Sequence, residues 1–159
     1  MKGDFSRFTH KLEKHYTSVL KQQGRVDLDA DWNEQACIQA YLNEEGSKDI
    51  LGPSGTPSRQ AGFGISKASI GENGIDFSIG PGRIYVDGIL CQLEGKEASY
   101  LKQPYYVNPE MIKAPGAGRR DLIYLDVWKR HVTAVEDDSL REIALGGPDT
   151  TTRLKTIWQ

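Results

Sequence analysis

The stretch QQGRVDLDADWNEQ, residues 22–35, decides how the chain is divided, because it holds both a turn and the start of a helix. Gly24 can adopt a positive φ at no steric cost, so a bend is expected there. After it, Val26 and Leu28 alternate with polar residues. This period predicts a short, half-buried strand over 25–29.

A helix is predicted to begin at Asp31, because Asp31 and Glu34 have the spacing of a capping box. The Asp31 carboxylate can accept hydrogen bonds from the free N–H groups of the first turn, while Glu34 reaches back to the cap. Trp32 is expected to be the large apolar anchor of this helix. Gly52, with a proline after it, has the pattern of a helix end, so the predicted span is 31–51.

Several unusual strings follow this stretch in a fixed order: GPGRIYVDGIL at 80–90, YLDVWKRHVT at 124–133 and ALGGPDTTTR at 144–153. Together with residues 22–35, they resemble an uncharacterised bacterial domain family. In that family the domain lies at the N-terminus of longer proteins encoded among phage-tail-like and contractile injection genes. The resemblance implies a structural role at a baseplate or tail-fibre attachment, and that this chain is the N-terminal part of a longer one. The family has no established catalytic residues.

The length of 159 residues predicts a single domain over 1–159. Its parts are an N-terminal arm (1–21), a strand, turn and helix (22–51) and a mainly β region (63–159). A net charge of −2 gives no long-range attraction for nucleic acid. No apolar run approaches the roughly 20 residues of a membrane span. The N-terminus lacks the apolar core of a signal peptide, so we expect synthesis in the cytoplasm without Sec export, within a particle that stays there or is released.

The N-terminal arm has two interpretations. Apolar residues at helical spacing allow a short helix over 11–21. Alternatively, the arm is extended, with Phe5 and Phe8 as apolar hooks. An extended arm either reaches a neighbouring subunit or folds back on its own chain.

Beyond residue 62 the apolar period changes to two, which predicts β structure. Strands are expected over 63–70, 75–79, 83–93, 121–135 and 150–159. A hairpin is expected at 72–74, a type II turn at Pro81 and Gly82, a bulge at Gly88 and a long loop over 98–120. A short helical turn is expected after Asp137. The predicted fold is α+β, with one main N-terminal helix packed on a mostly antiparallel sheet.

Candidate catalytic and metal sites do not form complete patterns. Asp27, Asp29 and Asp31 have the spacing that opens a calcium loop, but Trp32 stands where that loop needs glycine. Each acidic residue also has a place on a strand face or at a cap. Cys37 and Cys91 lack metal-type spacing and are expected to be small apolar residues rather than a disulfide. We therefore expect no enzyme activity, no metal and no cofactor.

Aromatic residues favour an interaction role instead, because tyrosine and tryptophan are enriched at protein interfaces. The predicted interaction residues are Phe5, Phe8, Tyr100, Tyr105, Tyr106 and Trp158. The expected partners are protein subunits of a tail-like assembly and further copies of the chain. A carbohydrate-binding or carbohydrate-acting module is the alternative, since acidic and aromatic residues also serve sugars.

Overall fold

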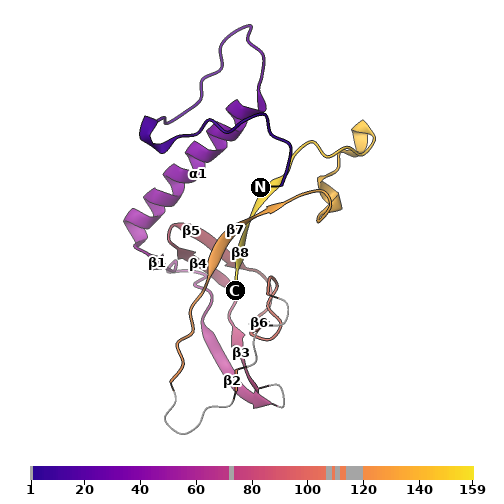
Figure 1. Cartoon of the computed structure of the whole chain (residues 1–159). Helices are drawn as coiled ribbons and strands as arrows, with labels where there is room; N and C mark the ends of the chain where they lie inside the picture. The colour runs from indigo at the N-terminus through magenta and orange to yellow at the C-terminus, as the bar shows by residue number, and fades with distance from the viewer. Residues whose placement is uncertain (1, 72–73, 107–108, 110–111, 114–119) are drawn as a thin grey trace.

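The structure is a computed structural model that describes residues 2–71, 74–106, 109, 112–113 and 120–159. These residues form an α+β fold with one long helix near the N-terminus and antiparallel strands after it (Figure 1). The helices are η1 (Leu12–Lys14), α1 (Asp29–Leu51), η2 (Asp138–Leu140) and η3 (Ile143–Leu145). The strands are β1 (Ser54–Gly55), β2 (Ile65–Gly71), β3 (Gly74–Ile79), β4 (Gly82–Val86), β5 (Ile89–Leu93), β6 (Ala98–Ser99), β7 (Val127–Val132) and β8 (Arg153–Trp158). The predicted fold class is confirmed.

Helix α1 begins two residues earlier than predicted, and the predicted capping box is wrong. The N-cap is Leu28, which makes no side-chain cap hydrogen bond. The carboxylate of Asp31 instead lies 2.8 Å from the Lys21 ammonium. Glu34 accepts a hydrogen bond of 2.5 Å from the Thr9 hydroxyl. Partners from the N-terminal arm thus occupy both carboxylates that local spacing assigned to the cap.

The segment before α1 is a loop rather than the predicted half-buried strand over 25–29. The bend at Gly24 is confirmed, with φ at 71°. Val26, however, is 82% exposed, and Trp32, the expected apolar anchor, is 66% exposed. Ile38 and Ala30 are the buried residues of the helix. The predicted end of the helix is confirmed, because Gly52 caps it at a φ of 76°.

The strands divide into three small antiparallel sheets rather than one continuous sheet. Their strand orders are β1-β4-β5, β2-β3-β6 and β7-β8. The predicted single strand over 83–93 is a hairpin, in which Asp87 and Gly88 form the two-residue turn between β4 and β5. Both turn residues have positive φ, 50° and 81°, which is the geometry that an Asp-Gly pair favours in a tight hairpin. The bulge prediction at Gly88 is therefore wrong.

The bend at Pro81 and Gly82 leads from β3 of one sheet to β4 of another. Gly82 has φ at 132°, and a Cβ there would lie 2.6 Å from the carbonyl oxygen of Gln60. Only glycine fits this close approach of two backbones. The predicted hairpin turn at 72–73 and the loop residues 107–108, 110–111 and 114–119 lie outside the described residues.

The last two strands pair with each other, β7 with β8. Both predicted strands are present and shorter than predicted: β8 covers Arg153–Trp158 of 150–159, and β7 covers Val127–Val132 of 121–135. Between them, the helical turn expected after Asp137 is confirmed as η2, whose N-cap Asp137 accepts a hydrogen bond from the backbone of Ser139.

The core lies where the three sheets meet, around Phe77, Ile79, Cys91 and Trp158. The Trp158 indole donates a hydrogen bond of 3.2 Å to the carbonyl oxygen of Gln92, so its polar edge is satisfied inside the core. Burial raises the pKa of the Cys91 thiol to about 11. Both cysteines are free; Cys91 is buried, as expected, and Cys37 is half-buried.

Helix α1 rests on the β4–β5 turn. A Cβ on Gly88 would lie 2.1 Å from the carbonyl oxygen of Glu44, so the turn and the helix backbone are in direct contact. Ion pairs flank this contact, one from Lys48 to Asp87 at 2.7 Å and one from Lys129 to Glu44. The glycine of the turn therefore sets how closely the helix approaches the sheets.

The N-terminal arm starts beside β7 and crosses the first turns of α1 (Figure 1). The backbone N–H of Lys2 donates to Nδ1 of His131 at 3.1 Å, and the Phe5 ring stacks on the same imidazole at 5.7 Å. Phe5 also packs edge-on against Phe8 at 5.2 Å. The arm thus folds back on its own chain, and the helix considered for 11–21 is reduced to the single turn η1.

Candidate functional site

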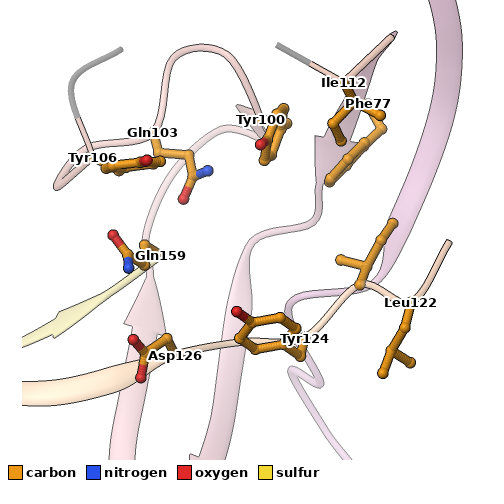
Figure 2. Close-up of a pocket in the computed structure, with 10 residues that line it drawn as sticks. Phe77, Tyr100, Gln103, Tyr106, Ile112, Leu122, Tyr124, Asp126 and Gln159 are labelled. Atoms are coloured by element: carbon orange, nitrogen blue, oxygen red, sulfur yellow. The ribbon is translucent and has the colours of Figure 1, made fainter. Parts of the chain in front are cut away.

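Two adjoining apolar hollows open beside the core, with volumes of about 260 and 350 Å³. Both are lined by Phe77, Tyr100, Gln103, Ile123, Tyr124 and Gln159. Figure 2 shows the first hollow, with Gln103, Tyr106 and Tyr100 on one side and Tyr124 and Asp126 on the other. The second extends between β3 and β4 and reaches core residues such as Ile79 and Val86. The hollows are thus an unfilled continuation of the core.

One wall of the first hollow is built by the corner that follows β6. Tyr100 stacks on Phe77 of β3 at a ring distance of 4.9 Å. The carboxylate of Asp76 holds this corner, because it accepts hydrogen bonds from the Ser99 hydroxyl and the Leu101 N–H. The stacked rings therefore have a fixed position at the edge of the hollow.

Gln103 is the polar residue of this wall. Its side chain is only 8% exposed, and its amide oxygen is buried without a hydrogen-bond partner. Buried polar atoms nearly always have a partner in a protein, so an unpaired amide oxygen beside a hollow marks a position where a donor fits. Gln103 is not among the interaction residues that the sequence predicts. The available signal was an amide side chain between tyrosines, in a loop of the length that is usually functional.

The opposite wall is the segment Leu122–Leu125, which leads into β7 without secondary structure of its own. Within the described part of the chain, its backbone N–H and C=O groups make no hydrogen bond. Leu122 is 87% and Tyr124 is 77% exposed. Pairing begins only at Asp126, which exchanges two backbone hydrogen bonds of 3.0 Å with Gln159. The site therefore combines an unpaired strand-like backbone, an apolar hollow and a lone acceptor.

The comparison with protein families covers the whole chain: the model of a family of unknown function, DUF6519, matches residues 1–159. The chain belongs to this family. Neither the curated proteins nor the solved structures gave a match. The family description assigns no activity to this DUF6519 chain.

The predicted interaction residues of the DUF6519 chain lie in three different places. Tyr100 and Tyr106 line the hollow. Tyr105 and Trp158 contact each other edge-on at 5.8 Å, and Trp158 belongs to the core. Phe5 and Phe8 lie on the arm, beside His131. Only the two tyrosines at the hollow therefore belong to the candidate site.

The acidic residues considered for calcium do not gather around an empty position. The Lys21 ammonium lies 2.8 Å from both Asp27 and Asp31, where a metal ion would have to bind. Asp29 accepts two hydrogen bonds from Ser6, and these lower the pKa of its carboxyl group. Among the residues that the structure describes, no group of three potential metal ligands occurs. A search of the same residues finds no helix long and apolar enough to cross a membrane.

A second exposed apolar surface lies away from the hollow, on the loop before α1 and the first turn of the helix. We call it the N-terminal apolar surface; it consists of Tyr16, Leu20, Val26, Leu28 and Trp32. Figure 1 shows this loop projecting beyond the helix. Large apolar side chains that are exposed on one segment are candidates for contact with another protein.

Proposed function

We propose that this chain is a non-enzymatic assembly domain that completes its packing against other protein subunits. The observation that carries the proposal is its accessible surface of 11920 Å². A compact folded monomer of 17.7 kDa exposes about 8,000 Å². The excess of about 4,000 Å² is several times the roughly 800 Å² that each partner buries in a standard interface. It includes the N-terminal apolar surface and the residues of the open hollow.

The proposed setting is a phage-tail-like particle of the contractile injection type, at a baseplate or tail-fibre attachment. This part rests on the resemblance of the strings at 22–35, 80–90, 124–133 and 144–153. Subunits of such particles form symmetric assemblies, so a homo-oligomer is part of the proposal. Exposed apolar residues on two separate faces are consistent with contacts to more than one neighbour.

Co-expression with the tube, sheath and baseplate subunits of a contractile injection particle tests this function. We expect one of these subunits to co-purify with the wild-type chain. Changing Leu20 and Trp32 on the N-terminal apolar surface to serine should weaken that association. A matched variant, with Lys11 and Lys14 changed to serine on the polar part of the arm, should not. If no particle subunit binds under conditions where the particle itself assembles, the proposed function is wrong.

A carbohydrate-binding role is the second candidate. Tyrosine rings at the hollow, Tyr100, Tyr106 and Tyr124, lie beside the amide of Gln103 and the carboxylate of Asp126. Sugars use such combinations of aromatic faces and hydrogen-bonding side chains. Glycan-array binding that is lost in Tyr106→Ala and kept in Tyr16→Ala would support this candidate. An array without signal would leave assembly as the function.

A further inference from the structure

Helix α1 carries an uncharged, open stripe along one side. Its members follow one another at alternating spacings of four and three residues: Trp32, Ala36, Gln39, Asn43, Gly46 and Ile50. Trp32 is 66% and Ile50 is 83% exposed, and a Cβ on Gly46 would meet nothing within 4 Å. This alternation is the spacing of the contact residues in a two-stranded coiled coil. We call these six residues the α1 stripe.

The opposite side of the helix is the one that contacts the rest of the chain. There the Tyr41 ring lies 6.5 Å from the ring of His10, and Lys48 forms its ion pair with Asp87. Residues seven apart lie on the same side of a helix, so these contacts belong to one face. Figure 1 shows the arm across the first turns of α1 and the sheets at its C-terminal end. The α1 stripe is therefore the face that the fold of the chain itself leaves open.

We propose that α1 pairs with α1 of a second copy of this chain, antiparallel, along the α1 stripe. This inference rests on the proposed assembly function and names the contact. One alignment brings the whole stripe together in layers: Trp32 lies opposite Ile50, Ala36 opposite Gly46 and Gln39 opposite Asn43 of the second copy. Because the alignment is two-fold, each of these layers forms twice.

Each layer joins residues of matching size and chemistry. The large apolar side chains of Trp32 and Ile50 close both ends of the contact. The small residues of the next layers let the two helix backbones approach closely. In the centre, the Gln39 amide already donates to the Asn43 amide at 3.0 Å, and polar residues at such central positions fix the register of paired helices. A parallel alignment would instead oppose Trp32 to Trp32 and Gly46 to Gly46, which gives a bulge at one layer and a gap at another.

The charges of α1 are placed so that two copies can approach. The positions that flank the stripe between 32 and 50 hold these residues: Asn33, Gln35, Ala40, Leu42, Ser47 and Asp49. Asp49 is the one charged residue among them, and antiparallel pairing brings it beside the Gln35 amide rather than another carboxylate. Leu42, 43% exposed, meets Leu42 of the second copy. The excess exposed surface of about 4,000 Å² per chain leaves ample area for the roughly 800 Å² that each partner of a stable dimer buries.

Cysteine cross-linking tests the alignment. In a Cys37→Ser background, a Gln39→Cys chain is mixed with a tagged Asn43→Cys chain. Mild oxidation should give a disulfide-linked mixed dimer, because residues of one layer bring their Cβ atoms within about 4 Å. Either variant alone should stay largely monomeric on a denaturing gel, since its own cysteines lie about one helical turn apart. Self-linking as efficient as mixed linking, or no mixed dimer, would overturn the antiparallel alignment.

Sedimentation equilibrium of the full chain provides a second test. Gly46→Glu places a bulky charged side chain against Ala36 of the second copy, whereas Gly46→Ala adds a methyl group that the small layer accepts. At about 100 µM, we expect the wild type and Gly46→Ala to be dimers, and Gly46→Glu to dissociate about tenfold or more readily. Neither variant should melt below the wild type in the monomer range, because the position is open and both residues favour a helix more than glycine does.

A wild type that is monomeric, or a Gly46→Glu variant that dimerises as well as Gly46→Ala, rejects the helix pairing. Co-purification with particle subunits would in that case still support the assembly function. Conversely, a dimer that meets these expectations and binds no particle subunit would keep the helix pairing and reject the proposed setting.

Discussion

At the scale of single residues, few side chains are fully enclosed, and each therefore contributes much to the stability of the fold. Trp158, Ile38 and Cys91 are the largest of them. Ile38 is the apolar residue through which α1 is buried, at 1% exposed. Tyr41 and Leu42 of the same helix keep about two fifths of their surface in solvent, at 41% and 43%.

Replacing Ile38 by aspartate should lower the free energy of unfolding by several kcal/mol, because the new carboxylate would be buried without a partner. Ile38→Val is the matched control and should cost only about 1 kcal/mol, since it removes one methylene group. Urea unfolding followed by circular dichroism measures both. If Ile38→Asp unfolds at the same urea concentration as the wild type, the helix is not part of the core.

The N-terminal arm should detach in acid before the core unfolds. The hydrogen bonds from Ser6 lower the pKa of Asp29, and the hydrogen bond from Lys2, followed by the charge of Arg130, lowers the pKa of Glu136. A carboxyl group with a lowered pKa in the folded state stabilises that state above its unfolded pKa. This stabilisation is lost as the pH falls through the folded pKa.

We therefore expect the NMR signals of the Phe5 ring to move to free-chain positions as the pH falls below the ordinary carboxyl range of about 4. The Trp158 signals should still be native where this change begins. Ser6→Ala removes the hydroxyl hydrogen bond to Asp29 and keeps the one from the backbone N–H, so it should shift the release to higher pH. Simultaneous loss of the Phe5 and Trp158 signals would show that arm and core are one cooperative unit.

At the scale of elements, the contact between α1 and the β4–β5 turn admits no side chain at Gly88. Gly88→Ala would place a Cβ against the backbone of Glu44, at a positive φ that alanine avoids. We expect a loss of about 2 kcal/mol or more in unfolding free energy. Gly46→Ala is the control, because nothing lies within 4 Å of that position and the helix should gain about 0.5–1 kcal/mol. A Gly88→Ala variant as stable as the wild type would mean that the turn and the helix are not in contact.

The elements that local sequence signals define are the ones that could be predicted. Signals from adjacent residues define the helix end at Gly52 and strand β8. They also define the turn at Asp87 and Gly88, because an Asp-Gly pair favours a tight hairpin; the predicted bulge at Gly88 is wrong. The start of α1 could not be found locally, because Lys21 and Thr9 bind the carboxylates that would have capped it. The division into three sheets, and the position of Gln103 at the hollow, depend on contacts between distant residues. Residues 122–125 have the pattern of a strand, but no strand of the described chain pairs with them.

At the scale of the whole molecule, the N-terminal arm folds back on its own chain and should contribute to its stability. Deleting residues 2–9 removes the contacts with His131, Glu34 and Asp29. The melting temperature should therefore fall by a few degrees. The mass in solution should not change, because the arm folds back on its own chain. A drop to the monomer mass on deletion would instead assign the interface to the arm. Light scattering coupled to gel filtration distinguishes the two outcomes.

The place of Trp158 in the core has a consequence for how the chain is made. Its core neighbours, Phe77 and Cys91, are far earlier in the sequence. During translation, the hairpins β2–β3 and β4–β5 leave the ribosome well before the indole that they enclose. Until then their inner faces have nothing to pack on, and the growing chain is open to chaperones and to aggregation. The core can close only when strand β8 has left the ribosome, so the rate of synthesis from the end of β5 to the end of β8 sets how long this vulnerable interval lasts.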